Sequence, residues 1–318
     1  IKRGTLEING GTFTKNVTNE GNENAIVDGN GSGAYKGTII VSKKAGYAGD
    51  VSVTIKGGTF TNTLGDVIVM ANETDDLESV ITINEDNVTI TGNIKNYTEK
   101  ENAKIILEKS VAQVGDVKYM TIEEAIENVA DKGTIKLIGN VAMTGAGKYL
   151  SDETYKNQCA IEIAGKEVTI DLNGYEISAE CNTTIVIRED GKLTLTDTSE
   201  GKNGKVSNSS VVTIRNNGEL VIEAGDYREE NIYCMYLGSN SETTINGGKF
   251  GGIYTNGSQT NDCVLTINDG EFTELLYLAG SGTYKIEDGE FTDTNKNAVI
   301  EIKRGTLEIN GGTFTKNV

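Results

Sequence analysis

LEINGGTF, at residues 6–13 and again at 307–314, is the clearest copy of a pattern that recurs along the chain. Alternating apolar residues lead into a Gly-containing turn, and an aromatic residue closes the pattern. Further copies are VTIKGGTF (53–60), LVIEAGDY (220–227), TTINGGKF (243–250), LTINDGEF (265–272) and YKIEDGEF (284–291). Alternation with a period of two predicts a strand with one buried face, and Gly provides the backbone freedom that a tight turn needs.

The spacing of these copies indicates a solenoid. The closing aromatic residues at positions 227, 250, 272, 291 and 314 are separated by 23, 22, 19 and 23 residues. A step of this size, made of short strands and tight turns, is typical of a coil that stacks on its neighbours. One coil cannot bury its apolar face alone, whereas coils stacked about 4.8 Å apart can. We therefore predict an all-β fold of stacked coils.

Stacking predicts columns of identical side chains, because equivalent residues of successive coils lie above one another. An aromatic column should form inside the fold, and a ladder of side-chain amides should form at the turn. The predicted aromatic column consists of Phe250, Phe272, Phe291 and Phe314, and the predicted amide ladder of Asn9, Asn246, Asn268 and Asn310.

A longer repeat encloses these coils. Residues 1–17, IKRGTLEINGGTFTKNV, recur without a change at 302–318, which is an offset of 302 − 1 = 301 residues. We interpret the chain as one period, plus a short overlap, of a polypeptide with tandem 301-residue repeats; an artificial duplication is the alternative. The coil spacing continues across residue 302, so we expect the stack to run through both printed ends.

One segment departs from the strand pattern. In TIEEAIENVADKG (121–133), apolar residues follow helical spacing, and Thr121 with Glu124 forms a capping box. We predict a short helix near 121–132 that covers the open end of a solenoid. The polar stretch 93–102 suits a junction. The predicted division is 1–102, the last coils of one unit, and 103–318, the capping helix and first coils of the next.

The chain resembles a known group of proteins in these segments. VGDVKYMTIEEAIENVADKGTIKLIGNV (114–141), VTIDLNGYEI (168–177) and the INGGTF coils are similar to the pectate-lyase-like repeats of large bacterial surface proteins, common in anaerobic Gram-positive bacteria. The resemblance implies a right-handed parallel β-helix and an extracellular or cell-surface location. It does not name an activity, because lyases, glycosidases, adhesins and passive stalks share this fold.

Composition excludes several functions. The chain has 318 residues with 29 Lys+Arg and 47 Asp+Glu, a formal net charge of −18, and it contains no His, Pro or Trp. Such an acidic chain repels phosphate backbones, so we expect no nucleic-acid binding. No apolar run is long enough for a membrane span. Without His there is no Ser-His-Asp triad and no imidazole metal site.

Stacked acidic residues are the candidates for chemistry. Asp269 and Asp288 occupy the same turn position, with Glu271 and Glu290 beside them, and Glu287 adds to the cluster. Paired carboxylates serve glycoside hydrolysis, and stacked ones bind Ca²⁺. However, Asp-Gly is also ordinary turn chemistry, which is the interpretation we favour. We therefore predict no catalytic residues and no cofactor, with Ca²⁺ as a weak alternative.

Cysteine and tyrosine residues give two further candidates. Cys159 and Cys181 are 22 residues apart, or one coil, so either a disulfide or two buried thiols fits them. Cys234 and Cys263 fit the coil phase less well. Exposed aromatic residues bind sugars by stacking, and four tyrosines occur in neighbouring coils, close to the loop GSQTND (257–262): Tyr233, Tyr236, Tyr254 and Tyr277. The interpretation we favour is that they alternate between core and surface as ordinary strand residues.

These observations favour a structural function. We predict a non-catalytic component of an extracellular fibre, stalk or filament, whose partners are neighbouring copies of the same repeat. A carbohydrate-binding adhesin is the alternative, with glycans as partners, and a polysaccharide lyase or glycosidase is a third, weaker one. Near-identical repeats argue mildly against an enzyme, because one active site needs only one copy.

Overall fold

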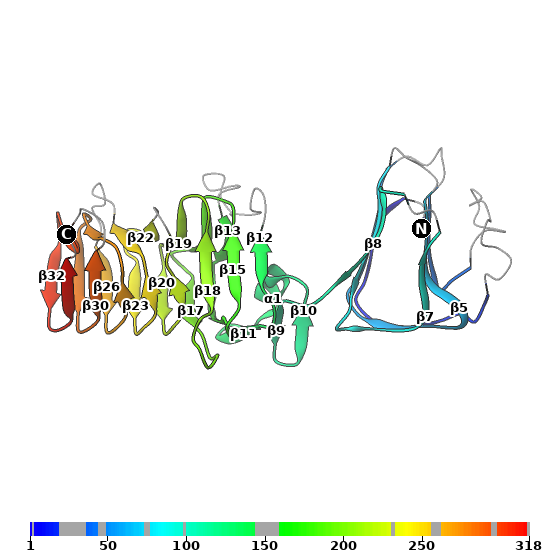
Figure 1. Ribbon diagram of the computed structural model, residues 1–318, viewed down its shortest axis with the longest axis horizontal. Coiled ribbons are helices and arrows are strands. Elements are labelled where there is room, and N and C mark those ends of the chain that lie inside the picture. Colours follow the sequence, from blue (N-terminus) through cyan, green and yellow to red (C-terminus); the bar gives the residue numbers. More distant parts are fainter. Residues whose placement is uncertain are drawn as a thin grey trace. The chain divides into compact units, whose positions relative to one another are not determined.

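The computed structural model describes residues 1, 3–18, 36–43, 49–72, 77–97, 100–143, 159–229, 233–255, 262–293 and 298–316. This part of the chain is mostly β, with one short helix, and its strands form parallel sheets of many strands (Figure 1). It divides into two compact units, Ile1–Ser110 and Val111–Val318, which we call unit 1 and unit 2. In the described residues no helix is long and apolar enough to cross a membrane.

Three sheets build unit 2. The first contains, in spatial order, β10 (Val117–Tyr119), β9 (Ala112–Val114), β11 (Gly133–Leu137), β14 (Glu167–Asp171), β17 (Lys192–Thr196), β20 (Glu219–Ile222), β23 (Glu242–Ile245), β26 (Cys263–Ile267), β29 (Gly282–Ile286) and β32 (Thr306–Ile309). The second contains β12 (Val141–Met143), β15 (Glu176–Ala179), β18 (Lys205–Asn208), β21 (Asp226–Tyr227), β24 (Lys249–Phe250), β27 (Glu271–Phe272), β30 (Glu290–Asp293) and β33 (Thr313–Lys316). The third contains β13 (Cys159–Ile163), β16 (Thr183–Ile187), β19 (Val212–Asn216), β22 (Tyr233–Leu237), β25 (Gly252–Thr255), β28 (Leu276–Leu278) and β31 (Ile300–Ile302).

From β11 onward the chain visits these three sheets in a fixed order. Each passage through all three is called a round, and each round adds one parallel strand to every sheet. The arrangement fits a solenoid-like fold, and no sheet closes on itself within the described part of the chain. Among the described strands, β9 pairs antiparallel with β10, as a hairpin before the first round, and also antiparallel with β11.

The sequence pattern explains the core of unit 2. Alternate residues of each strand point inward, so in-register pairing stacks Ile222, Ile245, Ile267 and Ile286 in one column. All four are almost completely buried. The turn that follows uses Gly with a positive φ, for example 128° at Gly289, where a residue with a side chain is strained.

Helix α1 (Ile122–Asn128) lies within unit 2, beside the β9–β10 hairpin. The Thr121 hydroxyl accepts a hydrogen bond from the Glu124 amide at 3.2 Å, and Ile122, Ala125 and Ile126 are buried in the core of the unit. The helix ends earlier than the sequence predicts, because Val129 already has an extended backbone.

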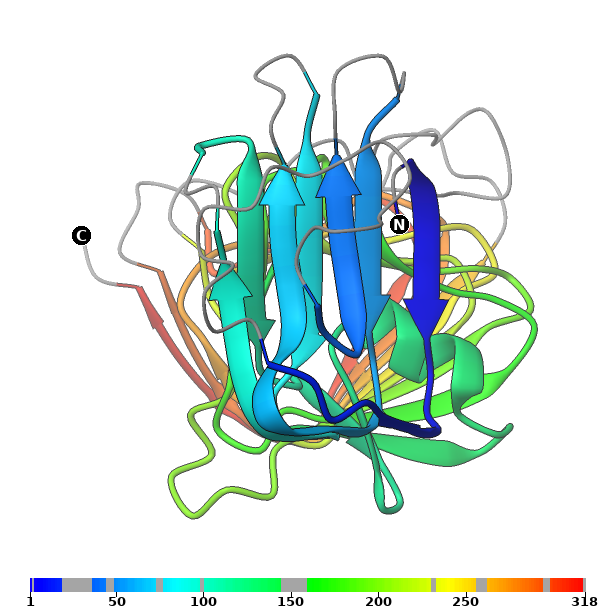
Figure 2. The ribbon, with the colours of Figure 1, turned by 90° about the vertical axis from the view of Figure 1, so that its right-hand side faces the viewer.

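Unit 1 repeats the parallel pairing in a smaller stack. One sheet has the order β1 (Gly4–Ile8), β4 (Val51–Ile55), β6 (Ser79–Asn84) and β8 (Ala103–Glu108). The other has the order β2 (Thr12–Thr14), β5 (Gly58–Asn72) and β3 (Ile39–Lys43), with β7 (Val88–Asn96) also paired to β5. These strands, in blue and cyan, run side by side in Figure 2.

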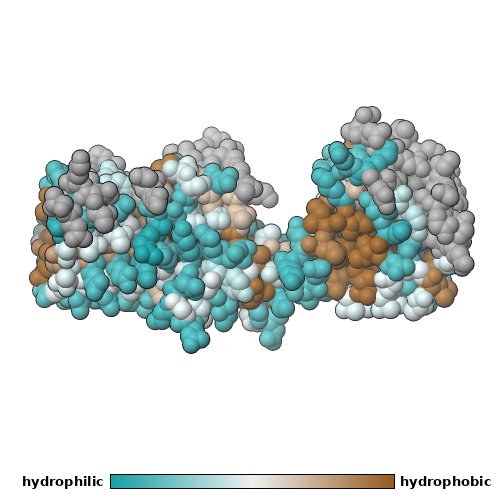
Figure 3. Space-filling view, viewed as in Figure 1, coloured by the Kyte–Doolittle hydropathy of each residue, from teal (hydrophilic) through white to brown (hydrophobic). Residues whose placement is uncertain are grey.

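The boundary between the units lies later than the sequence analysis placed it. β8 pairs along its whole length with β6 and so belongs to unit 1, which extends to Ser110 rather than to residue 102. The stretch 93–102 is not a junction, since its first residues lie in β7. β8 is the last strand of its sheet, and its Ile106 and Leu107 are exposed. Figure 3 shows an apolar surface, in brown, on unit 1.

Candidate functional site

The aromatic column runs through unit 2 on its second sheet. Phe250 and Phe272 stack with ring centroids 4.9 Å apart, Phe272 and Phe291 at 4.6 Å, and Phe291 and Phe314 at 4.8 Å. Tyr227 extends the column by one round, 5.3 Å from Phe250. The first four rings of this column are almost completely buried, whereas Phe314 is 40% exposed because β33 is the last strand of its sheet.

The turn ladder is mixed rather than purely amide. The Asn268 side chain donates to that of Asn246 at 2.7 Å, but glutamates take the same position in two other rounds. Asn246 donates to Glu223 at 2.9 Å, and Asn310 donates to Glu287 at 3.0 Å. Asn9 lies in unit 1, where Lys56 takes the next position of its stack. The predicted amide ladder thus holds between Asn246 and Asn268, whereas the side chain of Asn310 bonds to Glu287 and Asn9 belongs to the stack of unit 1.

The acidic candidates have structural partners. The Asp269 and Asp288 carboxylates accept hydrogen bonds from the Gly amides that follow them, at 2.7 and 2.8 Å. Glu271 lies opposite Glu290 in register, and on its other side it forms an ion pair with Lys249 at 3.7 Å. Within the described residues, no group of three or more acidic or Cys side chains is arranged to hold a metal ion.

The cysteines are unbonded. All four are buried free thiols, so the structure does not contain the Cys159–Cys181 disulfide. The reason is register: Cys159 lies opposite Thr183, two residues beyond Cys181. Burial is the main cause that raises the pKa of Cys159 to about 12, and the same holds for Cys234. Such thiols are poorly nucleophilic at neutral pH.

A tyrosine strip occupies the outer face of the third sheet. Tyr236, Tyr254 and Tyr277 lie opposite one another in successive rounds, with centroid distances of 5.5 and 5.4 Å. The Arg215 guanidinium lies 4.4 Å from the Tyr236 ring centroid at one end, and Tyr233 packs on Tyr254 from the side. Of the neighbouring loop, residues 256–261 lie outside the described residues.

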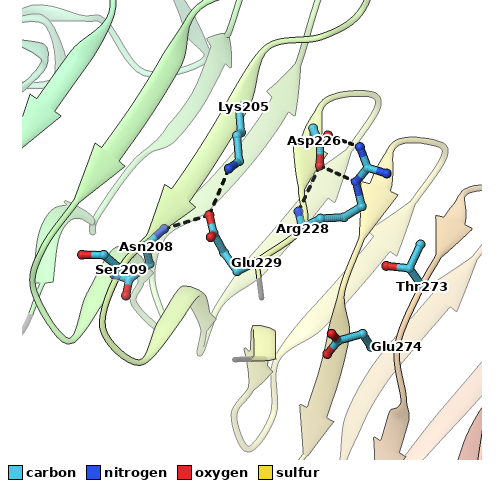
Figure 4. A pocket seen from close by; sticks show the side chains of 8 residues that line it. All are labelled: Lys205, Asn208, Ser209, Asp226, Arg228, Glu229, Thr273 and Glu274. Atoms are coloured by element: carbon cyan, nitrogen blue, oxygen red, sulfur yellow. Dashed lines mark hydrogen bonds and ion pairs between the residues drawn. The ribbon is translucent and has the colours of Figure 1, made fainter. Parts of the chain in front are cut away.

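A polar groove of about 630 Å³ lies beside strands β18 and β21 of the second sheet and the residues that follow them (Figure 4). It is lined by Lys205, Asn208, Ser209, Asp226, Arg228, Glu229, Thr273 and Glu274. Arg228 and Asp226 form a two-pronged ion pair at 3.0 and 2.5 Å, and Lys205 pairs with Glu229 at 3.4 Å. The cationic groups of the groove are therefore compensated internally.

The electrostatics of the groove follow from these pairs. Burial raises the pKa of Asp226, but hydrogen bonds from the Arg228 side chain and amide outweigh it and leave the pKa below its ordinary value. Burial, and secondarily the charge of Asp293, raises the pKa of Glu274. The groove can accept hydrogen bonds from a neutral ligand, whereas its two cationic and three acidic side chains leave no excess positive charge for an anion.

Sequence reasoning did not find this groove. The available signal is charge alternation at one coil position, since Glu176, Lys205, Asp226, Lys249 and Glu271 lie opposite one another in order. Of these neighbouring pairs, Lys249 and Glu271 form an ion pair, whereas Lys205 pairs with Glu229 and Asp226 with Arg228. The alternation by itself does not predict a cavity.

The chain matches no known protein-family model, no curated protein and no solved structure. Its function is therefore argued from its own residues. The described part of the molecule offers three surfaces of interest: the tyrosine strip, the polar groove and the open strand edges at the ends of the stacks.

Proposed function

We propose that both units are right-handed parallel β-helices and that the chain is a non-catalytic part of an extracellular fibre, stalk or filament built from tandem 301-residue repeats. The observation that carries the proposal is in-register stacking. From β11 to β31 every round adds one parallel strand to each sheet, and β32 and β33, which belong to the segment that also begins the chain, extend the first and second sheets by one more strand.

Such stacking resists extension and bending. Backbone hydrogen bonds join each round to the next, for example from the Asn310 amide to the Ile286 carbonyl at 2.8 Å. The aromatic column and the isoleucine column stack in the same direction, so each round buries its apolar face only against its neighbours. A load along the axis is therefore shared among many equivalent contacts.

The charges on the surface support a soluble fibre. The net charge of −18 opposes lateral aggregation, while ion pairs between rounds, such as Lys192 with Glu219 at 2.5 Å, limit repulsion within the stack. The acidic candidates Asp269 and Asp288 serve their turns, which supports a non-catalytic role.

The test is negative-stain electron microscopy of the native material. We expect long filaments of uniform width that antibodies against this chain decorate at regular intervals. Compact particles that carry the antibody label, without filaments, would reject the fibre.

The tyrosine strip favours a second candidate, a carbohydrate-binding adhesin. Aromatic rings that line one face of a sheet are suited to stacking on sugar rings. A glycan array probed with the chain and with Tyr254→Ala tests this function. Binding lost in Tyr254→Ala but kept in Val264→Ala, an exposed apolar position on the first sheet, supports it. No binding by the unmodified chain rejects it.

A further inference from the structure

The repeated 17-residue segment has its neighbours on opposite edges in its two copies. In unit 1, β1 and β2 pair with β4 and β5, which follow them in the chain. In unit 2, β32 and β33 pair with β29 and β30, which precede them. Within the described residues β31, β32 and β33 are each the last strand of their sheet.

The backbone bonds of the two copies are complementary. In residues 302–318, the amides of Asn310 and Thr313 donate to the carbonyls of the preceding round, both at 2.8 Å. Ile309 and Gly312 turn their carbonyls to the open edge of β32 and β33, as the other copy shows.

Residues 1–17 show what binds these carbonyls. Ile8, the equivalent of Ile309, accepts from the Lys56 amide at 2.8 Å. Gly11, the equivalent of Gly312, accepts from the Thr59 amide, also at 2.8 Å. Each copy thus uses the edge that the other leaves open.

Side-chain burial agrees with the backbone. Ile8 is 8% exposed beneath Ile55, whereas the identical Ile309 is 47% exposed. Phe13 stacks on Phe60 of the following round with centroids 4.8 Å apart, whereas Phe314 stacks on Phe291 of the preceding round, also at 4.8 Å. The open edge is therefore apolar as well as rich in unpaired carbonyls.

We propose that the open edge of β31, β32 and β33 binds strands β3, β4 and β5 of a further copy of unit 1. The strands of the further copy pair with this edge in the same register in which β4 and β5 pair with residues 1–17. Leu307 therefore lies opposite Val53 of the further copy, Ile309 lies opposite its Ile55, and Phe314 stacks on its Phe60. This inference rests on the tandem repeat of the proposed function and specifies the joint between successive repeats.

The third strand of the joint is placed by Ile1. In unit 1 the Ile1 carbonyl accepts from the Ser42 amide of β3 at 2.9 Å. The equivalent residue in unit 2 is Ile302, which ends β31 and is 43% exposed. β3 of the further copy therefore continues the third sheet of unit 2.

The test uses a two-repeat protein, in which the full chain continues after Val318 with residues 18–318 of a second copy. In register, Glu7 lies opposite Thr54 and both point outward. Glu308→Cys in the first copy and Thr54→Cys in the second should form an intrachain disulfide under mild oxidation, measured by peptide mass spectrometry.

The matched control moves one cysteine along the same outward face. Glu308→Cys with Ser52→Cys separates the pair by two residues, about 7 Å along the strand, beyond disulfide range. We expect at least tenfold less cross-linking. Equal yields from both pairs, or cross-links mainly between chains, would overturn the proposal.

An unmodified protein gives an independent readout. The Gly4 amide donates to the Asp50 carbonyl at 2.9 Å, so the Gly305 amide should find the same acceptor in the second copy. Hydrogen exchange at Gly305 should be at least tenfold slower in the two-repeat protein than in the 318-residue chain. Equal rates would contradict the joint, as would slow exchange in the single chain that depends on concentration, which indicates end-to-end binding instead.

These outcomes separate the joint from the fibre. A matched disulfide in a protein whose native source shows no filaments would reject the proposed function and keep the joint. Native filaments in the absence of the matched disulfide would reject the joint and keep the proposed function.

Discussion

Gly10 and Gly311 are the same residue of the repeated segment, yet their surroundings differ. A Cβ added at Gly311 would lie 2.3 Å from the Glu287 carbonyl oxygen, in the preceding round, whereas one added at Gly10 would meet no atom within 4 Å. We predict that Gly311→Ala destabilises unit 2 by about 1–3 kcal/mol, as overpacking against backbone does. Denaturant unfolding followed by hydrogen exchange in β29 and β32 measures the effect.

Gly10→Ala is the matched control, because its local sequence is identical and neither glycine has a positive φ. Its effect on unit 1 should stay within about 0.5 kcal/mol. Equal costs at both positions would show that the turn itself, rather than the neighbouring round, requires glycine.

Asp197 gives a pH dependence at the residue scale. Burial raises the pKa of its carboxyl, but hydrogen bonds from Ser199 and from the Gly204 and Gly174 amides outweigh burial, so the pKa is lowered overall. A lowered pKa in the folded state gives stability that is present above the unfolded pKa, about 3.8–3.9, and is lost as pH falls through the folded value.

Asp197→Asn should therefore weaken the loss of unit 2 stability below about pH 4. Urea unfolding midpoints measured between pH 2 and pH 7 show this as a shallower acid limb. A slope unaltered in Asp197→Asn contradicts the role of this carboxylate.

The sequence predicts strands and their inward faces well where local pattern and packing agree. In YKIEDGEF the alternation places Tyr284, Ile286 and Phe291 inside, and the structure buries all three. Prediction from the sequence fails where the register between neighbouring strands depends on the length of the loop that joins them. The 22-residue separation of Cys159 and Cys181 suggests one coil, but the intervening residues shift the strand pairing by two positions.

The candidate site shows the same limit. The stacking of the tyrosine strip follows from sequence spacing, because each round contributes one tyrosine at the same outward-facing strand position. The polar groove does not follow from this spacing, since Lys205 and Glu274, which both line it, come from different rounds. Glu287 stands at the asparagine position of the turn ladder, and the aligned copies YKIEDGEF and LTINDGEF already contain this difference.

At the scale of single elements, the stability of helix α1 depends on its N-cap residue, Thr121. The Thr121 hydroxyl accepts from the Glu124 amide, and the helix has only seven residues. Thr121→Ala should cost about 1 kcal/mol and raise hydrogen exchange at the Val129 amide, which donates to the Ala125 carbonyl, by about fivefold. Thr121→Ser keeps the acceptor and should retain protection; loss in both variants would point to packing of the Thr methyl group instead.

At the scale of the whole molecule, the two largest hydrophobic clusters of the described residues, one in each unit, have no residue in common. Phe60 is fully buried in the core of unit 1, and Phe272 lies in the aromatic column of unit 2. Phe→Ala at a buried site costs about 3–5 kcal/mol. We predict that Phe60→Ala lowers the stability of unit 1 alone and Phe272→Ala that of unit 2 alone.

Native-state hydrogen exchange under increasing denaturant distinguishes the two units, because amides of β4 and β6 report on one and amides of β20 and β23 on the other. Each variant should shift one set of amides and leave the other within about 0.5 kcal/mol. Since each round is supported mainly by its neighbours, protection in the Phe272→Ala variant should fall most in β24, β27 and β30 and least near α1. Equal loss in both sets would mean that the two stacks unfold as one cooperative unit.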